Sequence, residues 1–435
     1  MENLACLQSV VENLVSSHSP FHVVANLEKD LLLRGYLALK EGNEWNLEEG
    51  KGYFVKRNDS SIIAFRLPKE SAGLCFHIAA SHSDSPSFKI KPNPLTLSGG
   101  FALLQTEPYG GGIYHTWMDR PLSFAGRILY SDQSGIHSKL ADIDQDLLVI
   151  PSVCIHFERD VNEGKKFNPA VDMVPVFGSA EEGLDFDAFL KAKAGLSDEQ
   201  TLLSHDLFLY VREKPHFVGW NSQYLLSPRE DDLSSAYSSF YGFLHSENNS
   251  TIPMFCCFDN EEVGSLTRQG ARSTFLKDVV ARICGFYKVD KEEICPRSFL
   301  LSIDNGHAKH PNHPELSSAG SDIRLNKGIM VKFNANQSYT SDGLSSALIR
   351  YLARKERLNL QDFTNRSDLR GGSTLGNLSN GEISFLSADI GLPQLAMHSC
   401  NELLGALDVE DMGDLCRSFY STDFSIEEGD VRFKN

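Results

Sequence analysis

The stretch Ile252-Pro-Met-Phe-Cys-Cys-Phe258 runs directly into Asp259-Asn-Glu-Glu262, so an apolar segment of strand length ends in acidic residues. The same pattern occurs three more times, where short apolar segments lead into His82, Asp304 and His398. In an open α/β sheet, ligands gather outside the carboxyl ends of the strands, where residues from distant parts of a chain can meet. The sequence therefore predicts an α/β fold whose strand ends bring together histidines and carboxylates, which are metal-binding residue types.

The length and charge of the chain restrict its class. A chain of 435 residues indicates two domains, or one large domain with an insertion. The net charge of −17, without a Lys/Arg stripe to offset it, argues against nucleic acid and anionic membranes as partners. The longest apolar runs are shorter than the roughly 20 residues of a membrane span, and the amino terminus lacks the basic region of a secretory signal. We therefore expect an intracellular, cytoplasmic protein.

The cysteines do not indicate a disulfide framework. There are nine of them, scattered along the chain and without C-x-x-C spacing. Several lie in apolar runs, where cysteine behaves as a small buried hydrophobic residue. This pattern argues against both disulfides and a zinc knuckle.

The middle of the chain differs in character from its two flanks. Residues 89–227 alternate short β-like runs with Gly and Pro turns, as in Tyr109-Gly-Gly-Gly-Ile-Tyr-His-Thr-Trp117. This block lies between the first and second groups of candidate ligands. We therefore expect an inserted β-rich domain at 89–227, and a two-part domain formed by residues 1–88 and 228–435.

The residue pattern itself indicates how the candidate site works. In His82-x-Asp84 the two side chains share one face of a strand, so His82 could bind a metal ion while Asp84 accepts its other ring N–H. Of the adjacent Glu261 and Glu262, one could bind metal while the other acts as a general base. Each element also has an ordinary interpretation, such as polar surface, a solvated acidic turn, a helix N-cap or a buried core histidine. Only their conjunction favours a metal site.

Five sequence blocks, in order, resemble the signature blocks of the M18 aminopeptidases. The blocks are Pro228-Arg-Glu-Asp-Asp-Leu233, Asp259-Asn-Glu-Glu-Val-Gly-Ser265, Asp304-Asn-Gly-His-Ala-Lys-His-Pro-Asn312, Lys332-Phe-Asn-Ala-Asn-Gln-Ser-Tyr339 and Ala396-Met-His-Ser399. The resemblance extends over essentially the whole chain and is strongest to the aspartyl aminopeptidase branch. It implies a zinc-peptidase-like mixed sheet flanked by helices, with an inserted β-rich dimerisation domain in an otherwise catalytic chain.

The resemblance also implies a set of site residues. Two divalent ions, Zn²⁺ or alternatively Co²⁺ or Mn²⁺, are expected on five ligands: His82, Asp231, Glu262, Asp304 and His398. Asp231 is expected to bridge the ions, Glu261 to be the catalytic base and Asp84 to orient a ligand. The HExxH helix of single-zinc peptidases is absent from the sequence.

The implied activity is hydrolysis of the first peptide bond of peptide substrates. Lys332 occupies the position that faces an acidic first residue in the aspartyl branch, and Tyr339 belongs to the same block. A preference for amino-terminal Asp or Glu follows, because a Lys ammonium attracts carboxylates and repels basic side chains. His156 resembles a histidine that reaches into the neighbouring subunit's active site. A homo-oligomer is therefore expected, a dimer that assembles into a dodecamer.

The chain departs from the family pattern at several positions. Arg370, Gly371 and Asn377 stand where Pro, Cys and Pro are usual, and Arg370 could strengthen acidic selection or point into solvent. Asp232 and Gly306 replace the usual Asn and Ala beside metal ligands. Three alternatives therefore stay open: an aminopeptidase for neutral residues, a related dinuclear deacylase, and a catalytically silent oligomeric scaffold.

Overall fold

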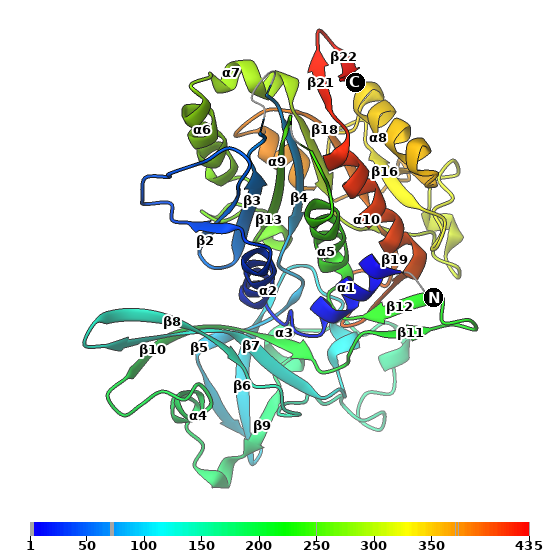
Figure 1. Ribbon diagram of the computed structural model, residues 1–435. Coiled ribbons are helices and arrows are strands. Elements are labelled where there is room, and N and C mark those ends of the chain that lie inside the picture. Colours follow the sequence, from blue (N-terminus) through cyan, green and yellow to red (C-terminus); the bar gives the residue numbers. More distant parts are fainter. Residues whose placement is uncertain (1–3, 70–73, 249, 370, 373, 435) are drawn as a thin grey trace.

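A nine-stranded mixed sheet forms the centre of the computed structural model, which describes residues 4–69, 74–248, 250–369, 371–372 and 374–434 (Figure 1). Across the sheet the strands are β1 (Leu37–Leu39), β2 (Gly52–Arg57), β3 (Ser61–Arg66), β13 (Ile252–Phe258), β4 (Phe76–His82), β14 (Phe299–Ile303), β18 (Leu386–Gly391), β16 (Ile329–Phe333) and β17 (Leu360–Thr364). The four strands β13, β4, β14 and β18 are parallel, whereas β3 and β16 run antiparallel to their inner neighbours. The predicted α/β fold with a mixed sheet is confirmed.

Helices cover both faces of this sheet (Figure 1). One face packs against α1 (Ala5–Leu14), α2 (Pro20–Leu33), α5 (Glu230–Leu244), α8 (Gly343–Glu356) and α10 (Ala406–Ser421), and the other against α6 (Phe275–Tyr287), α7 (Lys291–Ile294) and α9 (Leu375–Asn380). Along β13, Phe255 and Cys257 enter the first core, while Cys256 and Phe258 enter the second. Burial on both faces explains why this strand is an unbroken apolar run.

A second, six-stranded antiparallel sheet lies below the first in Figure 1. Its strands, in spatial order, are β8 (Gly135–Asp142), β7 (Leu122–Asp132), β10 (Thr201–Val211), β5 (Ser87–Ser98), β6 (Phe101–Tyr109) and β9 (Val176–Ser179), with α3 (Pro169–Asp172) and α4 (Phe186–Lys193) in the connections. It has a hydrophobic core of its own, in which Phe124, Leu207 and Trp117 are buried. This unit is β-rich and is built from the middle of the chain.

A small five-stranded sheet connects the ligand-bearing segments of the central domain. It consists of β11 (His216–Val218), β12 (Tyr224–Ser227), β20 (Glu402–Gly405), β19 (Pro393–Leu395) and β15 (Gly306–His307). β12 leads into Asp231, β19 and β20 flank His398, and β15 follows Asp304. β12 falls within the predicted insertion 89–227, yet it pairs with β20 of the central domain. A two-stranded ribbon, β21 (Phe424–Glu427) and β22 (Asp430–Phe433), lies near the carboxyl terminus.

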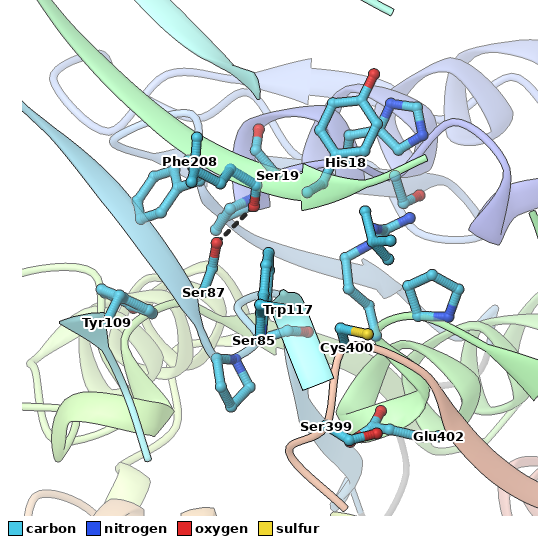
Figure 2. A pocket seen from close by; sticks show the side chains of 18 of the residues that line it. His18, Ser19, Ser85, Ser87, Tyr109, Trp117, Phe208, Ser399, Cys400 and Glu402 are labelled. Atoms are coloured by element: carbon cyan, nitrogen blue, oxygen red, sulfur yellow. Dashed lines mark hydrogen bonds between the residues drawn. The ribbon is translucent and has the colours of Figure 1, made fainter. Parts of the chain in front are cut away.

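The two large units meet at a closely packed interface. His18 stacks on Tyr210 with 3.9 Å between ring centroids, and both side chains bind Asp142, at 2.7 and 2.8 Å. A cavity of only about 30 Å³ lies here, between Ser19 and Phe208 on one side and Glu402 on the other (Figure 2). That space suits water molecules rather than a larger ligand. Within the described residues, no helix combines the length and apolar character that a bilayer span requires.

Candidate metal centre

Three adjacent parallel strands deliver most of the candidate ligands. His82 is the last residue of β4, Asp304 directly follows β14, and Glu261 and Glu262 lie in the short helix η4 (Glu261–Val263) just after β13. Because β13, β4 and β14 are neighbours and run parallel, their carboxyl ends meet at one edge of the sheet. His398 comes instead from the turn between β19 and β20, and Asp231 from the start of α5, where its backbone is not yet helical.

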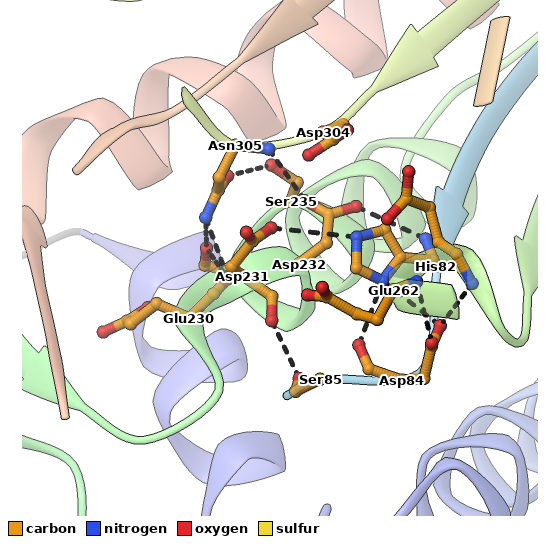
Figure 3. A network of polar contacts seen from close by, with 12 residues as sticks. His82, Asp84, Ser85, Glu230, Asp231, Asp232, Ser235, Glu262, Asp304 and Asn305 are labelled. Carbon is orange, nitrogen blue, oxygen red and sulfur yellow. Dashed lines mark hydrogen bonds and ion pairs between the residues drawn. The ribbon is translucent and has the colours of Figure 1, made fainter. Parts of the chain in front are cut away.

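Two groups of the predicted ligands share Asp231. Figure 3 shows four of the five predicted ligands, His82, Asp231, Glu262 and Asp304, close to one another. His82, Asp231 and Asp304 each offer a ligand atom within 4.8 Å of the others, and Asp231, Glu262 and His398 do the same. Nε2 of His398 lies 3.2 Å from Oδ2 of Asp231 and 3.4 Å from Oε1 of Glu262, while Nε2 of His82 lies 3.7 Å from Oδ1 of Asp231. The structure therefore brings all five predicted ligands together, with Asp231 between the two groups.

The chemistry of this cluster fits divalent cations. Oδ1 of Asp231 and Oε1 of Glu262 are buried and make no hydrogen bond to any described residue. Burying carboxylates without a partner costs several kcal/mol per charge, and a metal ion would remove that cost. Mixed imidazole and carboxylate donors suit Zn²⁺ and related ions. A third group, in which Glu261 joins His82 and Glu262, is also within ligand distance.

Asp84 organises the region around His82 through three hydrogen bonds to its carboxylate. Oδ1 accepts the backbone N–H of Glu261 at 3.1 Å, and Oδ2 accepts that of Glu262 at 3.1 Å and the hydroxyl of Tyr109 at 2.7 Å. Nδ1 of His82 lies 3.0 Å from the backbone oxygen of Asp84 but 3.4 Å from its carboxylate. The backbone oxygen of Asp84, rather than the predicted carboxylate, is thus the acceptor nearer to Nδ1 of His82. Either way, Nε2 of His82 faces Asp231.

Glu261 and Asp304 have raised proton affinities in the metal-free protein. Burial raises the pKa of Glu261 to about 8, and the charges of Asp304 and Asp84 add to the effect while His82 opposes it. Burial likewise raises the pKa of Asp304 to about 6 against the opposing charge of Lys332. These shifts reflect carboxyl groups crowded into a site of low polarity.

The cluster opens into a cleft of about 530 Å³ whose wall includes Lys332 and Tyr339. Lys332 is only 2% exposed, and its Nζ donates to the backbone oxygen of Asn305 at 2.7 Å. The same Nζ lies 3.8 Å from Oδ1 of Asp304 and 5.5 Å from the centre of the Tyr339 ring. The ammonium group therefore lies within the wall of the cleft, beside the candidate metal ligands.

The other sequence-based candidates fall in different places. His156 is exposed on a turn of the β-rich unit and does not line the cleft. Gly371 lines the cleft, whereas Arg370 lies outside the described residues. Asp232 accepts the backbone N–H groups of His82 and Asn305, at 3.3 and 3.2 Å.

Gly306 lies against two side chains beside the candidate ligand Asp304. A Cβ there would lie 2.3 Å from Cε of Met330 and 3.2 Å from Cε of Lys332. Both atoms are at the far ends of flexible side chains, so a small movement of these ends would make room for an alanine. The glycine in place of alanine has no structural explanation.

Sequence reasoning missed two residues that hold the ligands. The buried carboxylate of Glu402 accepts the backbone N–H of Asp231 at 2.9 Å through Oε2 and that of His398 at 2.6 Å through Oε1. The side chain of Asn305 donates to the backbone oxygen of Glu230 at 2.8 Å, next to Asp231. Glu402 lies only four residues after His398, but an acidic residue at that spacing has no specific signature. Asn305 follows the predicted ligand Asp304 directly, but an asparagine at that place has no specific signature either.

Comparisons with known proteins agree with the class of site. The model of the family described as aminopeptidase I zinc metalloprotease (M18) matches residues 13–420. The probable M18 family aminopeptidase 2 of Clostridium acetobutylicum is 39% identical over 411 residues, covering 92% of this chain and 95% of the relative. That of Pseudomonas aeruginosa strain PAO1 is 34% identical over 425 residues, covering 95% and 98%. The family match and the relatives identify the chain as a metallo-aminopeptidase. The chain belongs to the M18 family, which confirms the resemblance found in the sequence.

Solved structures agree as well. A chain in the cryo-EM structure of the Ape4 and Nbr1 complex superposes with a TM-score of 0.91 at 33% identity, covering 96% of this chain and 85% of the other. The crystal structure of prApe1 gives a TM-score of 0.89 at 26% identity, covering 95% and 94%. The shared architecture extends over both the central domain and the β-rich unit.

Proposed function

We propose that this aminopeptidase uses two divalent ions, Zn²⁺ or alternatively Co²⁺ or Mn²⁺, to remove amino-terminal Asp or Glu from peptides. The observation that carries the proposal is the position of Asp231, which belongs to two ligand groups at once. One carboxylate with two separated oxygens can serve one ion on each side. His82 and Asp304 would complete one site, and Glu262 and His398 the other.

The ions would polarise the scissile carbonyl and lower the pKa of a water molecule toward about 7. The proton transfers are assigned to a side chain of the protein. Glu261 lines the cleft beside the ligands and would take a proton from the attacking water, then give it to the leaving amine.

The acidic preference rests on Lys332. This residue is buried, and within the described residues its Nζ has Asp304 as its only ion-pair partner, at 3.8 Å. A substrate carboxylate entering the cleft could share that ammonium group, whereas a basic side chain would be repelled by it. The protein carries a net charge of −17, so a local cation is needed to hold an acidic substrate.

The oligomer is proposed from the surface around His156. Its neighbours Ile155 and Phe157 are 50% and 87% exposed, which is costly for apolar side chains in a lone chain. Association of two chains through this turn would cover these side chains and bring His156 toward the partner's cleft. We therefore propose a dimer formed at this surface, and its further assembly to a dodecamer rests on the family resemblance alone.

A substrate panel tests the function directly. Purified protein loaded with Zn²⁺, Co²⁺ or Mn²⁺ would be assayed on short peptides that differ only in the first residue, and on acylated amino acids. Release of Asp and Glu at least tenfold faster than Leu or Ala is expected. Faster release of Leu or Ala would assign it to neutral residues, and cleavage of only the acylated amino acids would make it a deacylase. Two bound ions without any turnover would favour a scaffold.

A further inference from the structure

The β-rich unit reaches the candidate metal centre through one glycine-rich segment. In residues 109–113, Tyr-Gly-Gly-Gly-Ile, Tyr109 is the last residue of β6, and the following residues leave the six-stranded sheet. Residues 109–113 form hydrogen bonds with two predicted site residues of the central domain, Asp84 and His398, and Gly110 lies close to a third, Glu262. The segment thus connects a sheet with a separate core to the ligands themselves.

The segment holds His398 at two points. The backbone oxygen of Gly111 lies 3.2 Å from Nδ1 of His398, and the backbone N–H of Ile113 donates to the backbone oxygen of His398 at 2.9 Å. A carbonyl oxygen can only accept, so Nδ1 carries the proton in this contact. Nε2 is then the ring nitrogen that could bind a metal ion, and it lies on the side of Asp231 and Glu262.

Tyr109 holds Asp84 in a similar way. Its hydroxyl donates to Oδ2 of Asp84 at 2.7 Å and accepts a hydrogen bond from Nδ2 of Asn260 at 2.9 Å. Asp84 in turn accepts the backbone N–H groups of Glu261 and Glu262. The hydroxyl therefore fixes the group that positions the predicted base and one predicted ligand.

Gly110 lies directly against Glu262. Its φ of +72° belongs to the left-handed region, and a Cβ there would lie 3.1 Å from Cβ of Glu262 and 3.3 Å from its Oε2. Any side chain would therefore press on the carboxylate of a predicted ligand. Glycine is required here both by the backbone and by the close approach.

We propose that residues 109–113 of the β-rich unit are positioning residues for the metal centre, so that the insertion sets metal affinity as well as shape. The inference rests on the proposed two-ion function and adds to it that part of the ligand support comes from the other domain. Gly111 and Ile113 hold His398, and Tyr109 holds Asp84. Gly110 leaves space for the side chain of Glu262. None of these residues is a predicted metal ligand or the predicted base.

The decisive comparison is Gly110→Ala against Gly100→Ala. Gly100 lies in the β5–β6 turn of the same sheet with a φ of +87°, but a Cβ there has nothing within 4 Å. Both variants therefore introduce the same kind of backbone strain, and only Gly110→Ala also presses on Glu262. Metal affinity, measured by competition with a chromophoric chelator, should fall about 10–100-fold in Gly110→Ala and stay within twofold in Gly100→Ala. Equal affinities in the two variants would overturn the proposal.

A second pair covers the case in which Gly110→Ala does not fold. Tyr109→Phe removes only the hydroxyl that Asp84 accepts. Tyr130→Phe is its control, because the Tyr130 hydroxyl on β7 makes no hydrogen bond to any described residue. Tyr109→Phe should lower kcat about tenfold at unchanged KM, change the visible spectrum of the Co²⁺-loaded protein, and leave the unfolding temperature of the metal-free protein close to that of Tyr130→Phe. An unchanged spectrum and kcat would refute the role of Tyr109.

These readouts separate the inference from the function on which it rests. Metal affinity and the Co²⁺ spectrum do not depend on turnover. If the wild-type protein binds two ions but releases no amino acid, the proposed function fails while the two comparisons still decide the positioning role. If the wild-type protein hydrolyses peptides and each variant matches its control in metal affinity and Co²⁺ spectrum, only the positioning role fails.

Discussion

Oδ2 of Asp231 lies 3.2 Å from Nε2 of His398, across 167 residues of sequence. The other oxygen, Oδ1, is turned toward His82. The carboxylate thus separates two groups of ligands instead of belonging to one. Because each oxygen of Asp231 faces a different group, substitution of Asp231 should affect both predicted metal ions.

Asp231→Asn and His398→Ala should differ in metal stoichiometry. Asp231 belongs to both ligand groups, so its substitution should weaken both ions, whereas His398 belongs to only one. Elemental analysis after dialysis against dilute Zn²⁺ is expected to give two ions per chain for the wild type, about one for His398→Ala and fewer for Asp231→Asn. A full-affinity ion retained by Asp231→Asn would contradict the bridging role.

Glu261→Gln should separate catalysis from metal binding. The amide keeps the shape of the side chain but cannot take up a proton, so kcat should fall by about 10²–10⁴-fold with KM and metal content unchanged. Steady-state kinetics and elemental analysis on the same preparation check this. Loss of an ion together with activity would instead make Glu261 a ligand.

Lys332→Met should change selectivity rather than overall activity. The ratio of kcat/KM for Asp over Ala substrates is expected to fall at least about 100-fold, which corresponds to about 2.7 kcal/mol of lost discrimination. Lys309→Met removes the same charge from a half-exposed lysine that pairs with Asp322 and does not line the cleft, so it is the control for general electrostatics. A similar loss in both variants would assign the effect to net charge. An unchanged ratio in Lys332→Met would remove Lys332 from substrate recognition.

The stability of the metal-free protein should fall as the pH rises from about 6.5 to 8. Burial raises the pKa of Glu261 and of Glu402 to about 8, so both hold protons in the native state that the unfolded chain has already lost. Burial lowers the pKa of His398, but its hydrogen bond to Asp231 and the charge of Glu262 raise it to about 10, so it adds to the effect. For each group the native state binds more protons than the unfolded chain in this pH window. Its contribution to stability is complete below the pKa of the unfolded chain and is lost as the pH rises through the pKa of the folded protein.

Two measurements check this sign. The unfolding temperature of chelator-treated protein should drop by several degrees across that pH window, whereas metal-loaded protein should change little, because ions replace the protons. Histidines with lowered pKa values, such as His77 at about 4, contribute mainly at lower pH. A metal-free protein that gains stability between pH 6.5 and 8 would disprove the assignment.

Mixed oligomers test whether His156 acts across subunits. His156→Ala should lose activity without losing metal, and Glu261→Gln should be inactive. When the two variants are refolded together, a mixed dimer would have one site with both an intact Glu261 and the partner's His156, so part of the activity should return. Absence of recovery, with mixed dimers demonstrated by mass spectrometry, would exclude action in trans.

The sequence predicted the central part of the site for a topological reason. His82, Glu262 and Asp304 lie at or just after the ends of three adjacent, parallel strands. Each strand is an apolar run followed by a histidine or a carboxylate, and such a run can be recognised from the sequence alone. His398 follows a similar apolar run, yet it belongs to a hairpin of a different, smaller sheet. Run length and composition do not distinguish these two cases, so the sheet that carries His398 could not be predicted.

The residues that support the ligands were harder to predict. The three glycines after Tyr109 predict a turn, because a run of glycines usually indicates one. Their contact with His398 spans 287 residues and depends on how the two domains pack. Glu402 acts through backbone N–H groups, and a backbone contact requires no particular residue type at the other end. Such contacts leave no pattern in a single sequence.

The place of β13 in the central sheet determines the order of events during synthesis. β3 and β4 are consecutive in the chain, but β13 lies between them and pairs with both. A nascent chain would therefore leave the edges of β3 and β4 that face β13 open until residue 258 has left the ribosome, while the whole β-rich unit emerges and can fold first. The catalytic half would then close around a finished insertion, and open edges of this kind are surfaces that a chaperone would have to shield.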